Sequence, residues 1–258
     1  MLTFFKVSSQ ETKVIQINQL GQEAGLLQLN AQTLTQDHLG YLWVGTEDGL
    51  HRFNGYKFKP YVAHAKDSSS ITDDHIRGLL AINDTLWIAT NSKGISGLKL
   101  SENRFFNLFE ENENRDLNIA YKILKVNKKF LLFSTKNHFI IYDRKKKETQ
   151  TFTLPKIKKE NFISDIIKVS ENTYWLATTG SGILIFNIST KEINSLQEFN
   201  QSSVTSFFKD KNTIIIGTDK GLFTHNITDN SFSKTALNNS VKYLFEKDTD
   251  QIYVATNQ

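Results

Sequence analysis

Short apolar runs recur along the whole chain, and each one is followed by a polar turn. The runs are rich in Ile, Val, Leu, Phe, Tyr and Trp, and the turns contain Gly, Asn, Asp and Lys. They lack the spacing of an amphipathic helix, and β-branched and aromatic runs separated by such turns are typical of strands. The pattern therefore predicts an all-β protein.

One core sequence repeats along the chain. Its clear copies are YLWVGTEDGL (41–50), LWIATNSKGI (86–95), YWLATTGSGI (174–183) and IIIGTDKGLF (214–223), and weaker copies are LLFSTKNHFI (131–140) and IYVATNQ (252–258). A repeat of about 40 to 50 residues that contains four short strands is typical of a β-propeller blade. The sequence predicts a single β-propeller domain over residues 1–258, with about six four-stranded blades.

Each predicted blade contains strands that we call a, b, c and d, in chain order, and strand b carries the repeated core. The third core position is small in every copy: Gly45, Ala89, Ser134, Ala177, Gly217 and Ala255. Blades converge toward the axis, so a larger side chain would overpack this position. A threonine always follows: Thr46, Thr90, Thr135, Thr178, Thr218 and Thr256. We expect its hydroxyl to bond a backbone group, and the glycines that open strand c to need positive φ.

The two ends of the chain each carry one half of a blade, and the two halves are complementary. The last copy stops after strand b, while MLTFFKVSSQETKVIQINQL (1–20) reads as a strand c, a polar turn and a strand d. The N-terminal c–d pair and the C-terminal a–b pair could therefore close the ring within one blade, which would remove exposed sheet edges. The alternative is a portion cut from a longer array, and the two readings are compatible.

Composition narrows the class of partner. The formal charge of +4 is a small excess on a mixed surface, so we expect no nucleic-acid partner. Cysteine is absent, which excludes disulfides and thiolate sites. No apolar run has the roughly 18 residues needed to cross a bilayer, so we expect no membrane insertion by this chain. We also recognise no signal peptide in it.

Residues 20–80 carry a more specific motif. It consists of a Gly-Leu pair, a QDxxGxxWxGTxxGL core, an RFNGYxF close and a Ser-Ile opening of the next blade. The residues are Gly25, Leu26, Gln36, Asp37, Gly40, Trp43, Gly45, Thr46, Gly49, Leu50, Arg52, Phe53, Asn54, Gly55, Tyr56, Phe58, Ser70, Ile71 and Ile76. This motif resembles the two-component regulator propeller family, and the match weakens after the first two blades.

The resemblance implies a function. Family members are extracytoplasmic sensor regions of bacterial hybrid histidine kinases and of some diguanylate cyclases, and their ligand is often an oligosaccharide. It implies a periplasmic location and neighbouring sensor domains of a parent protein. The family usually has about seven blades per propeller, whereas this chain has six cores, so we expect either a portion of a longer sensor or a shortened relative.

The sequence contains few residues in an arrangement that indicates catalysis. The six histidines show no paired metal-ligand spacing, and we expect no catalytic residue, no metal and no cofactor. The adjacent acids at 47–48 and 73–74 point apart on an extended chain. The basic run Arg144-Lys145-Lys146-Lys147 falls in a c–d turn, where a solvated edge is the expected role. We expect Trp43, Trp87 and Trp175 to be core residues.

A ligand site is best sought where the b–c and d–a loops meet on one face, because repeated loops around an axis form a concave opening. The predicted ligand-binding residues are Glu47, Asp48, Asp74, His75, Arg77, Lys93, His138, Asp219 and Lys220. The leading hypothesis is a non-catalytic sensing propeller that binds a small molecule or an oligosaccharide. The alternative is a structural or homodimerisation scaffold without such a ligand, and an enzyme of the propeller lyase or glycosidase kind is the less favoured third.

Overall fold

The computed structural model describes residues 19–257 except 65, 68, 109–112, 156–159, 201 and 249–250. In this part of the chain, five four-stranded antiparallel sheets are followed by one two-stranded sheet. Strands pair in chain order within each sheet, so every four-stranded sheet is a meander. The prediction of an all-β propeller built from four-stranded blades is confirmed.

The strands fall where the repeat predicts them. The first blade contains β1 (Thr33–Gln36), β2 (Leu42–Thr46), β3 (Gly49–Phe53) and β4 (Phe58–Tyr61). The second contains β5 (Ile76–Ile82), β6 (Thr85–Thr90), β7 (Ile95–Lys99) and β8 (Arg104–Asn107). The third contains β9 (Ala120–Lys125), β10 (Phe130–Thr135), β11 (His138–Asp143) and β12 (Glu148–Thr153).

The second half of the chain continues the same order. The fourth blade contains β13 (Ile163–Lys168), β14 (Thr173–Thr178), β15 (Ile183–Asn187) and β16 (Ile193–Leu196). The fifth contains β17 (Val204–Asp210), β18 (Thr213–Thr218), β19 (Gly221–Asn226) and β20 (Ser231–Lys234). The two-stranded sheet contains β21 (Val241–Asp248) and β22 (Gln251–Thr256), and the short helices are η1 (Gln22–Ala24), α1 (Arg115–Asn118) and η2 (Gln197–Phe199).

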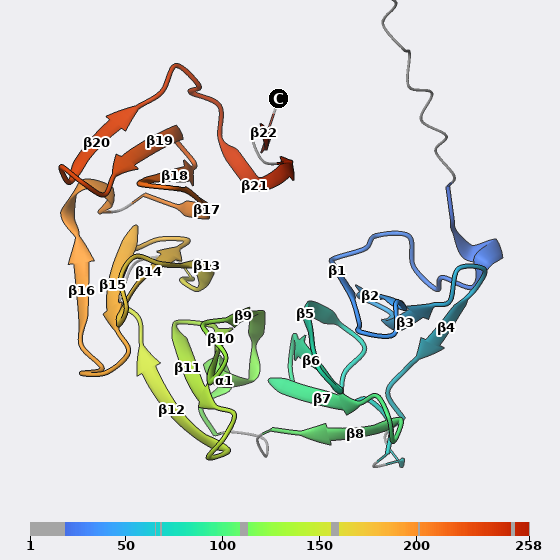
Figure 1. Cartoon of the computed structure of the whole chain (residues 1–258). Coiled ribbons are helices and arrows are strands. Elements are labelled where there is room, and N and C mark those ends of the chain that lie inside the picture. The colour runs from blue at the N-terminus through green and yellow to red at the C-terminus, as the bar shows by residue number, and fades with distance from the viewer. Residues whose placement is uncertain are drawn as a thin grey trace, which may run out of the picture.

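The sheets are arranged around a common centre. Figure 1 shows them in an arc, with the first strand of each blade nearest the centre and the fourth on the outside. The β21–β22 pair and the first blade stand at the two ends of this arc (Figure 1). The N-terminal c–d pair (1–20) that could close the ring lies almost wholly outside the described residues, which begin at residue 19, so closure stays a prediction.

The hydrophobic core lies between neighbouring blades. Each of the four main clusters combines residues of two adjacent sheets, and strand b is buried along almost its whole length. Trp43, Trp87 and Trp175 are all buried in these clusters, which confirms their predicted role. The reason is geometric, since an inner strand is covered on both faces.

The repeated small residue and threonine have the predicted roles. A Cβ atom on Gly45 would lie 2.5 Å from Cγ2 of Ile76 in the next blade, so the blade interface leaves no room there. The Thr178 hydroxyl donates to the Gly182 carbonyl at 3.0 Å and accepts from the Ser181 amide at 2.8 Å. Gly182 itself has φ of 70°. Equivalent threonine bonds close the b–c turns after β2, β6 and β18.

The QDxxGxxW motif builds the turn between β1 and β2. Asp37 accepts from the amides of Leu39 at 2.9 Å and Tyr41 at 3.0 Å, and from the indole Nε1 of Trp43 at 2.8 Å. Gly40 supplies the positive φ, 89°, that the turn requires. The motif is therefore structural: a buried carboxylate holds the turn and the core tryptophan together.

Candidate functional site

The b–c turns and the d–a loops lie on one face of the propeller. Backbone bonds join them from blade to blade: the Gly49 amide donates to the Asp74 carbonyl at 2.8 Å, and the Gly94 amide donates to the Asn118 carbonyl at 2.8 Å. The turn before β11 repeats the pattern, with Asn137 donating to the Asn161 carbonyl at 2.7 Å. The prediction that these loops share a face is confirmed.

A β-bulge recurs near the start of the innermost strands. The register shifts at the second residue of β5, β9, β13, β17 and β21. The bulged residues are Arg77, Tyr121, Ser164, Thr205 and Lys242. Gln32 holds the corresponding place before β1, where its amide donates to the Gly45 carbonyl at 2.9 Å. A bulge re-aims a side chain, so these positions place variable residues at the entrance to the axis.

A cleft of about 330 Å³ opens among the first of these positions. We call it the axial cleft, and it is lined by Gln32, Glu47, His75, Arg77, Tyr121, Lys122 and Phe162. Three of the predicted ligand-binding residues, Glu47, His75 and Arg77, therefore come together. The other four were not predicted, because they lie on or next to inner strands rather than in the variable loops.

Arg77 is held against a pair of aromatic rings. Its guanidinium carbon lies 4.7 Å from the centroid of the Tyr121 ring, and Tyr121 stacks on Phe162 with centroids 4.1 Å apart and planes inclined by 9°. The Nε atom of Arg77 is buried and has no hydrogen-bond partner among the described residues. Stacking therefore fixes a cation whose innermost donor is unsatisfied.

Lys122 lies next to this stack and reaches toward the centre of the ring. Its Nζ donates to the Ser164 carbonyl at 2.8 Å and lies 6.0 Å from the Tyr243 ring centroid on β21. Burial lowers the pKa of the Lys122 ammonium, and the charge of Asp165 partly opposes this. Burial also raises the pKa of the Asp165 carboxyl, although the amides of Phe207 and Ile166 donate to it at 2.7 and 2.8 Å.

The remaining lining residues add polar groups. Gln32 donates from Nε2 to Oε1 of Glu47 at 3.3 Å, and Glu47 is exposed at the edge of the cleft. The amide of His75 donates to Asp73 at 3.1 Å, and its carbonyl accepts from Asn91 at 3.0 Å, which anchors the backbone beside the cleft. The axial cleft thus combines one stacked guanidinium, one desolvated ammonium, one exposed carboxylate, one side-chain amide and one imidazole.

Comparison with known proteins adds context. No family model matches the chain. The extracellular domain of the putative hybrid two component system BT3049 from B. thetaiotaomicron superposes with a TM-score of 0.77 and 24% identity, covering 93% of this chain and 34% of that one. The chain resembles the sensor propellers of two-component systems, as its sequence predicted.

Other matches agree on the fold. The extracellular domain of the putative one component system BT4673 from the same organism gives a TM-score of 0.56 at 17% identity, over 88% of this chain and 37% of that one. PorZ, a surface component of the type-IX secretion system of Porphyromonas gingivalis, gives 0.62 at 13% identity, over 88% of this chain and 37% of that one. At these identities the likeness establishes the propeller fold alone.

A sequence relative supports the same resemblance over a short stretch. Histidine kinase P4 of Formosa agariphila is 48% identical over 48 residues, which are 19% of this chain and 4% of that protein. The chain therefore spans about a third of the solved extracellular domains and a small part of the kinase. No helix in the described residues has the length and hydropathy of a membrane span.

The other predicted ligand-binding residues lie on the same face but outside the lining of the axial cleft. Asp74 stabilises the d–a loop, since its Oδ1 accepts from the Ala63 amide at 2.6 Å. Asp219 accepts from the Ser203 amide at 3.1 Å, and Lys220 donates to the Ser202 hydroxyl at 3.3 Å. The rest occupy b–c turns or their ends: Asp48, Lys93 and His138. Ligand binding by all nine predicted residues stays a prediction.

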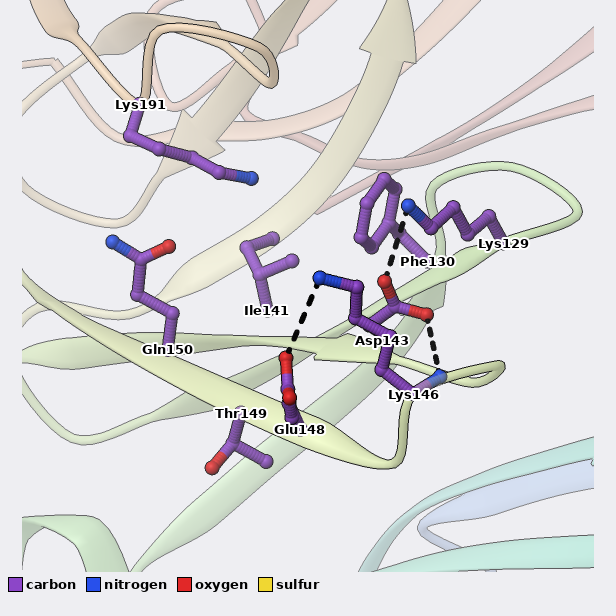
Figure 2. Close-up of a pocket in the computed structure, with 9 residues that line it drawn as sticks. All are labelled: Lys129, Phe130, Ile141, Asp143, Lys146, Glu148, Thr149, Gln150 and Lys191. Carbon is purple, nitrogen blue, oxygen red and sulfur yellow. Dashed lines mark hydrogen bonds and ion pairs between the residues drawn. The ribbon is translucent and has the colours of Figure 1, made fainter.

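A second cleft, of about 440 Å³, lies at the c–d turns between the third and fourth blades. We call it the rim cleft, and it is lined by Lys129, Phe130, Ile141, Asp143, Lys146, Glu148, Thr149, Gln150 and Lys191. Figure 2 shows Lys191 reaching in from the neighbouring blade, while Lys129 pairs with Asp143 at 3.1 Å and Lys146 with Glu148 at 3.8 Å. The basic run lies in the c–d turn, as predicted.

Among the described residues, no group of three or more His, Asp or Glu side chains is placed to hold a metal ion. The adjacent acids Asp73 and Asp74 bind different loops, since Asp73 accepts from the Ser92 amide at 2.7 Å and Asp74 from Ala63. They do not converge on a common point.

Proposed function

We propose that this chain is a non-catalytic, ligand-sensing propeller of a bacterial two-component-type signalling protein. The observation that carries the proposal is the superposition of 93% of the chain, with a TM-score of 0.77, on the extracellular domain of a putative hybrid two component system. A propeller hosts many functions, so the fold needs a site beside it, and the axial cleft is that site.

The ligand enters at the axial cleft. A pocket of about 300 Å³ or more with a few polar groups and an aromatic wall is typical of small-molecule sites. The proposed ligand is an oligosaccharide, as the sequence resemblance implies, and the proposed location is the periplasm. The proposed partners are neighbouring sensor domains of the parent protein, which would receive the signal from the ring.

A second function is favoured by a different observation. Tyr243, Phe245 and Tyr253 on the β21–β22 pair are 50%, 44% and 46% exposed, and their rings contact one another in series at 6.3 and 5.0 Å. An exposed aromatic cluster of this kind suits contact with another protein surface. The alternative is therefore a scaffold that dimerises or docks through this sheet, without a small ligand.

A thermal-shift screen against neutral and acidic oligosaccharides tests the proposal. A ligand at about 100 times its dissociation constant stabilises the folded state by roughly 2.7 kcal/mol, which raises the melting temperature by several degrees. We expect a hit that Tyr121→Ala abolishes and Lys146→Gln at the rim cleft preserves. A cooperative melt that no saccharide shifts, together with a tight dimer in sedimentation, would replace the sensor by the scaffold.

A further inference from the structure

We infer that the axial cleft selects a saccharide unit that carries an anionic group, and that Arg77 binds this group. The inference rests on the proposed ligand-sensing function and adds the chemical class of the ligand. Its starting point is the guanidinium of Arg77, which lines the axial cleft and forms no ion pair with an acid among the described residues. A cation in a cleft that has no carboxylate partner can bind the anionic group of a ligand through charge-assisted hydrogen bonds.

The guanidinium is already oriented for such a group. Tyr121 covers one face of it at 4.7 Å, and Phe162 backs Tyr121 at 4.1 Å. Stacking covers a face of the guanidinium and leaves its edge, with the Nη–H donors, as the part that can bind a ligand. This edge matches two oxygens of a carboxylate or sulfate in a parallel pair of hydrogen bonds. Because the ring stack fixes the side chain in advance, little rotamer entropy is lost on binding.

The charge balance of the cleft favours an anion. Arg77 forms no ion pair with any acid in the described part of the chain, and Lys122 adds a second cation beside the stack. The one lining acid, Glu47, lies at the exposed edge, where Gln28 and Gln32 donate to it at 3.5 and 3.3 Å. Burial lowers the pKa of Lys122 more than the charge of Asp165 raises it, so an anion bound nearby would favour the charged form of this ammonium.

The remaining polar side chains of the axial cleft are suited to binding a sugar ring. The His75 imidazole and the Gln32 amide can exchange hydrogen bonds with hydroxyls, and both line the same cleft as Arg77. A volume of about 330 Å³ is at the lower end of the usual range for ligand pockets, so it fits one anionic unit rather than a long chain.

The test measures the affinity of the whole chain for matched sugars by isothermal titration calorimetry. The probes are the disaccharides of galacturonic acid and of galactose, and a galactose disaccharide with a 6-sulfate. We expect the wild-type protein to bind an anionic probe about tenfold more tightly than the neutral one, since charge-assisted hydrogen bonds are about twice as strong as neutral ones. The preferred anionic probe identifies the group as carboxylate or sulfate.

The variants are Arg77→Gln and Arg77→Lys, with Lys146→Gln at the rim cleft as the matched control. We expect Arg77→Gln to weaken binding of the anionic probe about tenfold and binding of the neutral probe by less than about twofold. Arg77→Lys should restore part of the lost affinity for the anionic probe. Lys146→Gln should change the affinity for neither probe. Circular dichroism confirms that each variant is folded.

The outcomes separate the two proposals. Equal affinity for neutral and anionic probes, or a preference that Arg77→Gln leaves unchanged, would overturn the anionic class while the sensing function stands. Binding of no saccharide at all would overturn both.

Discussion

The axial cleft and the rim cleft contain the same kinds of group in opposite states. In both, a cation lies over an aromatic ring: Arg77 over Tyr121 at 4.7 Å in the axial cleft, and Lys129 and Lys191 over Phe130 at 4.7 and 5.1 Å at the rim. At the rim, however, Lys129 and Lys146 each have a carboxylate partner. In the axial cleft, Arg77 has none among the described residues, and its Nε is buried.

The difference shows that neither cleft size nor the number of lysines identifies a site. The rim cleft is larger, about 440 against 330 Å³, and has more cations. Two of its three lysines are paired with carboxylates, and one of these pairs is well solvated, since the Lys146 and Glu148 side chains are 62% and 71% exposed. Solvated pairs contribute little and leave little for a ligand to satisfy. A desolvated cation without a partner is the stronger indication of function.

The largest expected effect comes from removing the aromatic support of each cation. Tyr121→Ala should lower the free energy of unfolding by about 3 kcal/mol, because the ring is buried and packed on Phe162. Phe130→Ala at the rim should cost less, since Phe130 is only half-buried.

Urea denaturation measures both losses, and Tyr121→Phe is the control that keeps the ring stack. Equal losses for the two alanine variants would remove the contrast between the clefts.

The next effect is on ligand affinity. Lys122→Met should weaken binding of an anionic saccharide several-fold, because it removes the second cation of the axial cleft. Lys129→Met, the same change at the rim, should leave affinity within about twofold, because this charge is already paired with Asp143 at 3.1 Å. Calorimetric titration of the two variants compares them directly, and the opposite ranking would move the binding site to the rim.

A pH dependence should follow from the lowered pKa of Lys122. Between its folded pKa and the ordinary lysine value of about 10.4, the unfolded chain binds more protons, so this residue makes stability rise with pH in that window. Over the same window Lys122 loses its charge, so affinity for the anionic probe should fall. Lys122→Met should abolish that part of the fall, whereas Lys191→Met at the rim should preserve it. If the affinity of the Lys122→Met variant still falls by the same amount as pH rises, the fall is due to the titration of another group.

The smallest effect is expected from the exposed ion pair of the rim. Lys146→Gln should change the free energy of unfolding by no more than about 0.5 kcal/mol, since the 3.8 Å pair with Glu148 is solvated. Salt should reduce even this difference. If urea denaturation shows that Lys146→Gln loses more than about 1 kcal/mol of unfolding free energy, the rim ion pairs stabilise the fold and are not merely solvated.

Local patterns predicted much of the scaffold. The b strands, the small residue at the blade interface and the threonine after it are set by short-range constraints, and Gly45 and Thr178 behave as the pattern requires. Loop candidates were predicted less completely. Glu47, His75 and Arg77 meet in the axial cleft, whereas Asp74 bonds the Ala63 amide in its own loop. A turn carboxylate can serve either a ligand or its own backbone, and sequence does not distinguish the two.

Tyr121 and Lys122 were missed for a physical reason. On a regular strand, alternation tells which residues share a face, but the bulge in β9 inserts one residue and changes which side chains reach the axis. The pattern that would have revealed Tyr121 is the position just before the residue that pairs with the small residue of strand b, compared across blades. Arg77 and Tyr121 both hold that position.

The sequence by itself determined the repeat, the four-stranded blade, the tight turns and the resemblance to sensor propellers, because each depends on residues close together in the chain. Only the tertiary structure decided which variable side chains meet. Arg77 stacks on Tyr121 one blade away, and Lys122 reaches Tyr243 across the ring, since blade packing and the bulges bring them together. Whether a cation is paired or unsatisfied depends on these distant neighbours, and that is what separates the axial cleft from the rim cleft.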